Sequence, residues 1–115
     1  MHAVDYLYKN KIIHRDIKPE NIMYVRGAPG VGDGKIKLID FGAATKLGHG
    51  KTINQEMYGA ANYMSPEMLR GTYDHKTDVW SIGVIAWLML TKKQPFEGRN
   101  DKDVIDEVLN KILDM

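Results

Sequence analysis

The chain has 115 residues, with 16 Lys or Arg against 15 Asp or Glu, a formal net charge of +1, and no cysteine. This length allows at most one domain with a modest core. The balanced charge argues against nucleic acid or an anionic membrane as a general partner, and the lack of cysteine excludes disulfides and is compatible with the cytosol.

The first elements expected along the chain are a helix and a hairpin. Residues 2–11 carry apolar side chains on one side, which predicts the end of an amphipathic helix, and residues 12–13 predict a short β segment. Residues 22–25 and 35–39 predict two strands, the second with alternating polar and apolar residues. The glycine-rich stretch 27–34 between them predicts a solvent-exposed turn.

The middle of the chain predicts a loop followed by a long helix. Residues 43–64 show little periodicity and many small or polar residues, so we expect a mobile loop there. A helix that begins at Thr77 or Asp78 and ends at Thr91 is apolar on every face and should be surrounded by protein. Its longest apolar run, residues 79–90, is far shorter than the about 20 residues that cross a bilayer, so no membrane span is expected.

The C-terminal stretch 99–113 predicts an amphipathic helix. Its apolar residues recur with the helical period, and Asn100 or Asp101 is placed to be the N-cap. We therefore expect one face of this helix to pack on the core. The apolar stripe consists of Val104, Ile105, Val108, Leu109, Ile112 and Leu113.

Two polar motifs carry the candidate chemistry. Residues 14–21 read His-Arg-Asp-Ile-Lys-Pro-Glu-Asn, and residues 40–42 read Asp-Phe-Gly. The first motif offers an acid, a lysine and an amide on a stretch too rich in Pro and charge to be a buried strand. The second places an acid on a Gly-hinged turn after an apolar strand. Phosphoryl transfer needs these parts: a carboxylate to orient a hydroxyl, a cation near the moving phosphate, and Asn and Asp ligands for Mg²⁺.

The two motifs resemble the catalytic loop and the metal-binding turn of eukaryotic protein kinases. Residues 65–67, Ser-Pro-Glu, resemble the Ala-Pro-Glu motif of that family, and residues 78–84 resemble the start of its long central helix. Lys18, two residues after the acid, is typical of serine/threonine kinases. The stretches 71–76 and 94–98 look most like those of calmodulin- or calcium-dependent kinases.

This resemblance implies an α+β fold of the kinase large lobe, mainly α-helical, with a small antiparallel β-hairpin that carries the catalytic and metal-binding loops. Residues 1–115 would be a partial protein kinase domain, truncated at both ends. The expected piece is the core of the C-terminal lobe. It would lack the N-terminal lobe, with its Gly-rich loop and ATP-binding lysine, and the last helices of the C-terminal lobe.

The resemblance also assigns roles to the polar residues. Asp16 would be the catalytic base, and Lys18 would neutralise charge on the moving phosphate of ATP. Asn21 and Asp40 would bind Mg²⁺. The competing interpretation of the three oxygen-bearing residues is ordinary turn chemistry, and that of Lys18 is a solvated surface charge.

Two further residues are expected at the edge of the nucleotide site. Met23 matches the apolar residue beneath the adenine ring, although a plain strand residue is the alternative. Glu20 matches a position that contacts basic substrate residues in some kinases. The complete expected cofactor-binding set is Lys18, Glu20, Asn21, Met23 and Asp40.

Other motif residues are expected to be structural. His14 should pack on the ring of Phe41 and join the two motifs. Asp78 should accept N–H bonds from the catalytic loop, act as a helix N-cap, or do both. Residues 43–64 resemble the activation segment of kinases, and Arg15 should pair with a phosphate on it. The candidate phosphate acceptors are Thr45, Thr52 and Tyr58.

Two positions depart from the family pattern. Ala60 stands where the family usually has a Thr whose hydroxyl bridges the catalytic Asp and Lys, so hydrogen bonding and some positioning should be lost. Ala43 is smaller than the usual Leu after the metal turn, which leaves the preference between Ser and Thr substrates open.

The expected function of the parent domain is transfer of the ATP γ-phosphate to Ser or Thr hydroxyls of a protein substrate. The partners would be ATP with Mg²⁺, a protein substrate, and a regulator of the calcium/calmodulin type that acts through segments outside this chain. The chain alone should be inactive, because nucleotide would be held on one side only. The alternatives are a non-catalytic or pseudokinase-like binding module, and a helical scaffold in which Asp16, Asn21 and Asp40 lie far apart.

Overall fold

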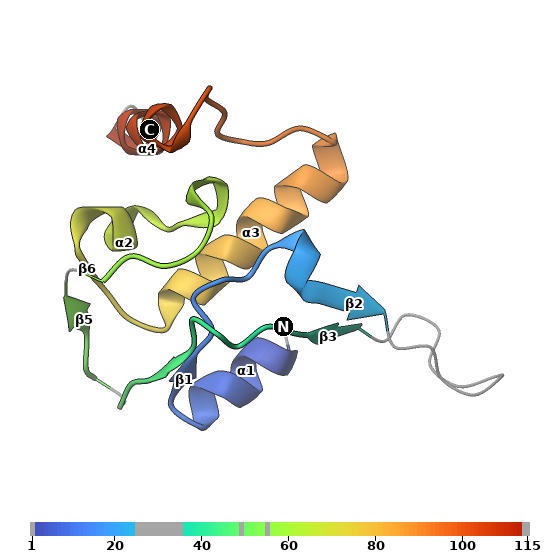
Figure 1. Ribbon diagram of the computed structural model, residues 1–115, viewed down its shortest axis with the longest axis vertical. Coiled ribbons are helices and arrows are strands. Elements are labelled where there is room, and N and C mark those ends of the chain that lie inside the picture. Colours follow the sequence, from blue (N-terminus) through green and yellow to red (C-terminus); the bar gives the residue numbers. More distant parts are fainter. Residues whose placement is uncertain (1, 25–35, 49, 55, 114–115) are drawn as a thin grey trace, which may run out of the picture.

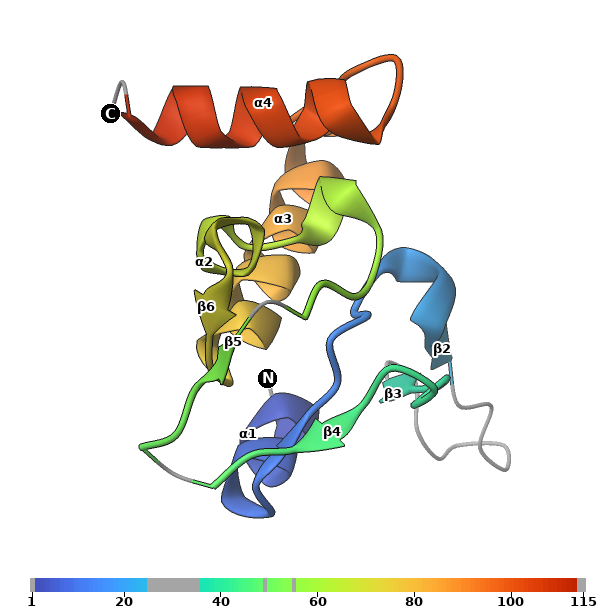
Figure 2. The same ribbon diagram turned by 60° about the vertical axis from the view of Figure 1, so that its left-hand side comes forward.

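The computed structural model describes residues 2–24, 36–48, 50–54 and 56–113 (Figure 1). The long helix α3 runs through the middle of the molecule, and α1 and α4 lie at opposite ends of the molecule (Figures 1 and 2). The elements in chain order are α1 (His2–Lys9), β1 (Ile12–Ile13), the 3₁₀ turn η1 (Pro19–Asn21), β2 (Ile22–Tyr24), β3 (Ile36–Leu38), β4 (Thr45–Lys46), β5 (Ile53–Asn54), the 3₁₀ turn η2 (Ala61–Tyr63), α2 (Pro66–Arg70), β6 (Thr72–Tyr73), α3 (Lys76–Thr91) and α4 (Asp101–Leu113).

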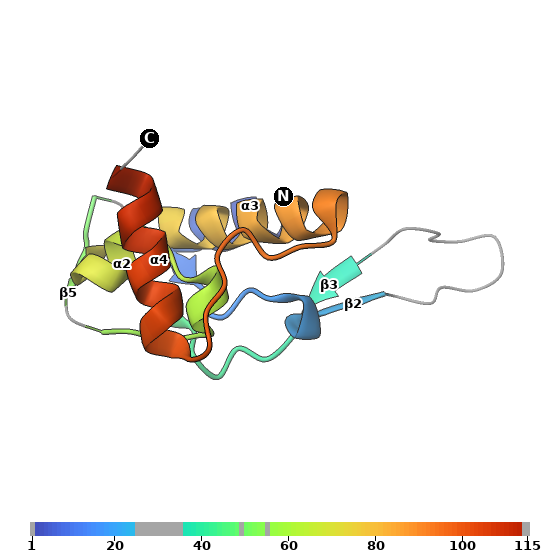
Figure 3. The same ribbon diagram turned by 90° about the horizontal axis from the view of Figure 1, so that it is seen from above.

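The strands of the described residues form three antiparallel pairs of two strands each. The predicted hairpin is confirmed as β2–β3, in which Met23 lies opposite Lys37, and it projects from the side of the molecule (Figure 3). The turn predicted at 27–34 lies outside the described residues. The other two pairs, β1–β4 and β5–β6, join segments far apart in the sequence.

The predicted loop 43–64 is therefore more regular than expected. It contains β4, β5 and η2. Two-residue strands such as β4 are too short to show a period of their own, and they form because a partner strand offers backbone groups. That partner is β1 for β4 and β6 for β5.

The core below the His14–Asn21 loop joins α1, that loop and α3. Its buried members are Val4, Ile17, Tyr63, Val84 and Ile85. Ile17 is 1% exposed, so the loop is fixed to the core by an apolar side chain in the middle of a polar motif. This packing holds the partly buried polar neighbours of Ile17, Asp16 and Lys18, in place beside the core.

Helix α4 packs through the stripe predicted from its sequence. Val104 and Val108 are buried against Ala61, and Asn100 accepts a hydrogen bond from the Asp103 N–H at 3.0 Å. Asn100 is therefore the N-cap residue, one of the two alternatives. The side chains of residues 111–113 lie outside the described set.

The expectation that helix α3 is surrounded by protein is wrong. The side chains of Trp87, Met89 and Leu90 are 54%, 74% and 86% exposed. An all-round apolar helix predicts burial in general, but its sequence does not tell which neighbours will cover each face. No helix among the described residues is long and apolar enough to cross a membrane.

Helix α2 was not anticipated, although its sequence carries the signals. Ser65 Oγ accepts the Met68 N–H at 3.1 Å, Pro66 occupies the first turn, and Gly71 ends the helix in the left-handed region at φ 108°. These are the preferred N-cap, first-turn and C-terminal residues of a helix.

Candidate active site

The His14–Asn21 loop is fastened to the start of α3 by one carboxylate. Asp78 is 2% exposed, and it accepts the N–H of His14 at 2.8 Å and that of Arg15 at 3.0 Å. The predicted contact with the loop is confirmed. The N-cap alternative is wrong, because the N-cap of α3 is His75 and Asp78 lies within its first turn.

Burial of Asp78 has an electrostatic consequence. Burial raises the pKa of this carboxyl group, because water no longer stabilises its charged form, and the two N–H bonds oppose the rise. The bonds hold Arg15 in the left-handed region at φ 70°, which is rare for a residue with a side chain. Asp78 therefore helps to hold a strained backbone next to Asp16.

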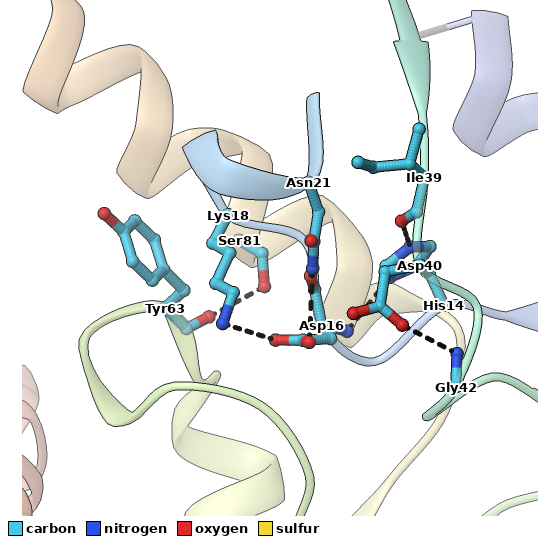
Figure 4. Close-up of polar contacts among 9 residues, drawn as sticks. All are labelled: His14, Asp16, Lys18, Asn21, Ile39, Asp40, Gly42, Tyr63 and Ser81. Carbon is cyan, nitrogen blue, oxygen red and sulfur yellow. Dashed lines mark hydrogen bonds and ion pairs between the residues drawn. The ribbon is translucent and has the colours of Figure 1, made fainter. Parts of the chain in front are cut away.

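Asp16 and Asn21 form the centre of the loop. The Asn21 amide nitrogen donates to the backbone carbonyl of Asp16 at 2.7 Å and to its Oδ2 at 3.2 Å. Because both bonds use amide hydrogens, the orientation leaves the Asn21 Oδ1 as the atom available to a ligand. Lys18 Nζ forms an ion pair with Asp16 Oδ1 at 3.7 Å (Figure 4).

Backbone contacts bring the Asp-Phe-Gly turn beside this loop. The Ile39 N–H donates to the carbonyl of Asn21 at 2.9 Å. His14 accepts the Asp16 N–H at Nδ1 (3.1 Å), so the other nitrogen, Nε2, is the one that donates to the Ile39 carbonyl at 3.0 Å. The ring of His14 also meets that of Phe41 edge-on at 4.7 Å, which confirms its predicted structural role.

Asp40 has the conformation of a residue positioned by its turn. It lies at φ 58°, and its Oδ1 accepts the Gly42 N–H at 3.2 Å. Figure 4 shows its carboxylate directed into the space that Asp16 and Asn21 also face. The scaffold alternative, with these residues on separate faces, is therefore wrong.

The residues expected at the edge of the site have exposed side chains. Glu20 is exposed in η1, and Met23 is 49% exposed on β2. Phe41 is 46% exposed on the neighbouring turn. The sequence thus predicted the cluster of Asp16, Lys18, Asn21 and Asp40, whereas Glu20 and Met23 face outward.

Arg15 joins the loop to segment 43–64 through groups that the sequence did not reveal. Its side chain donates to the Ala43 carbonyl at 2.6 Å, to Glu56 Oε2 at 3.1 Å and to the Tyr73 hydroxyl at 3.2 Å, and its guanidinium lies 3.9 Å from the centre of the Tyr58 ring. Burial raises the pKa of the Tyr73 hydroxyl, and the bond from Arg15 opposes this rise. No sequence pattern linked Arg15 with Glu56, 41 positions away.

The predicted phosphate acceptors have different positions in this arrangement. Thr45 is half-buried in β4, Thr52 is exposed, and Tyr58 lies over Arg15. A carboxylate, that of Glu56, supplies the negative charge that we expected from a phosphate. The phosphate itself remains a prediction.

The donor set fits Mg²⁺ better than a softer metal. Among the described residues no group of three or more His, Cys, Asp or Glu could hold a metal ion. The oxygens of Asn21 and Asp40 are hard ligands of the kind Mg²⁺ takes in pairs, with water and phosphate oxygens completing its shell.

The fold and the two facing turns define a kinase-like protein, and the family comparison agrees. The model of the family described as "Protein kinase domain" matches residues 1–115. The chain belongs to this family.

The chain is similar in sequence to protein kinases whose names include calcium-dependent or calcium/calmodulin-dependent. The chain is 41% identical over 106 residues to "Calcium-dependent protein kinase 4" of Plasmodium falciparum, covering 92% of this chain and 20% of that protein. It is 38% identical over 112 residues to "Calcium/calmodulin-dependent protein kinase type IV" of Homo sapiens, covering 96% and 23%. The chain therefore spans about a fifth of the length of the curated relatives that it matches.

Proposed function

We propose that this chain is the core of the large lobe of a protein serine/threonine kinase, and that the parent domain transfers the γ-phosphate of ATP to Ser or Thr hydroxyls of proteins. One observation carries the proposal. The carboxylates of Asp16 and Asp40 and the amide of Asn21 face one space, and Asn21 is hydrogen-bonded to Asp16 at 2.7 and 3.2 Å.

Each polar residue has a role in this proposal. Asp16 accepts or orients the proton of the substrate hydroxyl as it attacks phosphorus. Lys18, 3.7 Å from Asp16, neutralises charge on the transferred group. Asn21 and Asp40 hold Mg²⁺, which when bound neutralises the negative charge of the phosphates.

The outward-facing residues have less direct roles. Met23, half-exposed on the hairpin beside the cluster, contacts the adenine ring through its apolar side chain. Glu20, an exposed acid on η1, contacts a basic residue of the protein substrate. Regulation of the calcium/calmodulin type, suggested by the names of the relatives, acts through segments outside this chain.

The direct test is a chimera in which residues 1–115 replace the matching segment of "Calcium-dependent protein kinase 4" of Plasmodium falciparum. Phosphoryl transfer to a Ser/Thr peptide is measured with Mg²⁺ and ATP. Asp16→Asn should lower kcat by about 10²–10⁴-fold, the usual contribution of a general base. Asp106→Asn, an exposed acid on α4, is the matched control and should leave the rate unchanged. Asp16-independent turnover by an active chimera would refute the proposed role.

For residues 1–115 tested alone, the alternative of a non-catalytic protein is favoured. Met23 and Phe41, 49% and 46% exposed, leave the face beside the cluster open to water. A nucleotide bound there would lack contacts on its other side and most of the benefit of positioning. We therefore expect no measurable phosphoryl transfer by residues 1–115 alone. Asp16-dependent turnover by this chain would contradict that expectation.

A further inference from the structure

A cavity lies where three segments distant in the sequence meet, away from the Asp16 cluster. Its volume is about 40 Å³, and since one water molecule needs about 10–15 Å³, the cavity has room for roughly three waters or one small polyatomic ion. None of the cluster residues Asp16, Lys18, Asn21 and Asp40 lines it. The described lining residues with ionisable side chains are Tyr8, Lys11, Lys51, Asp74 and His75.

Backbone and ring contacts fix the segments around this cavity. Strands β1 and β4 pair, and just beyond them the Leu47 N–H donates to the Lys11 carbonyl at 2.7 Å. This bond brings the chain that continues to Lys51 beside the α1–β1 junction, and α1 and β4 lie together at one end of the molecule (Figure 2). The start of α3 is held there by the ring of His75, whose centre lies 4.0 Å from that of Tyr8. Two lysines and a histidine are therefore brought to one cavity by contacts that need no ligand.

The described lining residues carry an excess of positive charge. Lys11 and Lys51 supply two positive charges against one negative charge from Asp74, and His75 supplies an imidazole N–H donor or a further cation. Neither lysine has an ion-pair partner within the part of the chain that the structure describes. Asp74 already accepts a hydrogen bond at Oδ1 from the Lys76 N–H at 2.9 Å. This excess of unpaired cations favours an anion as the occupant of the cavity.

We propose that this cavity binds one phosphate group, which accepts hydrogen bonds from Lys11, Lys51 and His75. A phosphate on a side chain carries a charge of about −1.5 to −2 at neutral pH and presents three acceptor oxygens, one for each of these donors. A carboxylate has two oxygens and a single charge, so it would leave one of the two lysines without a partner. Both lysines are exposed, so the phosphate group enters from solvent. It belongs either to a phosphorylated side chain or to free inorganic phosphate.

This site goes beyond the proposed transfer reaction, because binding there needs neither nucleotide nor Mg²⁺. Lys11 belongs to the α1–β1 junction, Lys51 follows β4, and His75 precedes α3. A phosphate group held by all three would connect segment 43–64 to α1 and α3. A ligand that binds only the folded chain stabilises it by mass action. The site therefore links phosphate binding to the position of that segment.

The test is a titration of the 115-residue chain with inorganic phosphate, followed by the backbone amide NMR signals of Gly48, Gly50 and Lys51. Sodium chloride at matched ionic strength is the reference, so that screening is separated from binding. We expect saturable shifts with phosphate and none with chloride. Lys51→Gln should raise Kd about tenfold, because a charge-assisted hydrogen bond is lost, and Lys11→Gln should do the same. Lys102→Gln, at an exposed position on α4 at the opposite end of the molecule, is the matched control and should leave Kd unchanged.

A second titration uses phosphothreonine with both ends capped, which presents the same oxygens on a side chain. Tighter binding than that of inorganic phosphate would assign the site to phosphorylated side chains, and equal or weaker binding would assign it to free phosphate. Two results would overturn the proposal. One is amide shifts with phosphate that are no larger than those with chloride, and the other is a Kd that neither Lys51→Gln nor Lys11→Gln changes.

Discussion

Replacing Asp78 by Asn tests the link between α3 and the His14–Asn21 loop. The two oxygens of Asp78 accept from His14 and Arg15 at 2.8 and 3.0 Å, so Asn keeps one acceptor and turns an amide group toward the other N–H. The loss of a charge-assisted bond costs about 1.5–3 kcal/mol, and a buried N–H without an acceptor costs about 1–3 kcal/mol more. Removal of a buried charge offsets part of this, and we expect a net loss of about 2–3 kcal/mol.

The pH dependence of this loss has a defined sign. Burial raises the pKa of Asp78 above its ordinary value of 3.8, so the folded chain binds the proton more tightly than the unfolded chain. The contribution of Asp78 to stability is therefore fully present below the unfolded pKa and declines as pH rises through the folded pKa. Asn does not titrate, so the stability difference between the two proteins should widen as pH falls from neutral through this window.

The assay is urea unfolding followed by circular dichroism, at neutral pH and in mild acid. Asp106→Asn is the control, because an exposed acid away from such contacts should change stability by less than about 0.5 kcal/mol. If Asp78→Asn is also within about 0.5 kcal/mol of the unmodified chain, the two hydrogen bonds do not fasten the loop. A stability difference between the two proteins that becomes smaller in acid would contradict the raised pKa of Asp78.

Three other substitutions test contacts of the same structure by urea unfolding. Glu56→Gln should lower the free energy of unfolding by about 1–2 kcal/mol, because the buried guanidinium of Arg15 loses its ionic partner, whose own side chain is half-exposed. An unchanged urea midpoint would contradict this. Ser65→Ala should cost about 1–2 kcal/mol, because Ser65 Oγ caps α2 and lies 2.7 Å from Thr77 Oγ1; stability equal to that of the parent chain would argue against the cap. Leu90→Lys, at an 86% exposed position, should change stability by less than about 0.5 kcal/mol and raise the soluble concentration; a larger loss would mean that this face is covered.

Much of the secondary structure followed from local patterns. The helical periods at 2–11 and 99–113 correspond to α1 and α4, and the paired strands correspond to β2–β3. These elements satisfy most of their backbone groups within a short stretch, so local sequence suffices. Helix α2 could also have been found from Ser65 and Gly71, whereas β4 and β5 could not, because their partners lie elsewhere in the chain.

The candidate active site was likewise predictable only in part. The order and spacing of the polar residues in 14–21 and 40–42 were enough to indicate the family and to select Asp16, Lys18, Asn21 and Asp40. The sequence did not reveal that Glu56 and Tyr73 would meet Arg15, nor that Asp16 Oδ1 would be buried without a hydrogen-bond donor from the part of the chain that the structure describes. Those facts depend on where side chains from separate segments point.

Local stretches of sequence specify which chemical groups are present and which turns carry them, because motif spacing and helical period act over a few residues. Which of these groups meet depends on how the whole chain folds. Ile17 packs into the core, and Asp78 accepts hydrogen bonds from two loop N–H groups. Gly59 lies so close to the loop that a Cβ on it would be 2.6 Å from the Arg15 carbonyl. Such contacts follow from close packing of the whole chain, which no local pattern encodes.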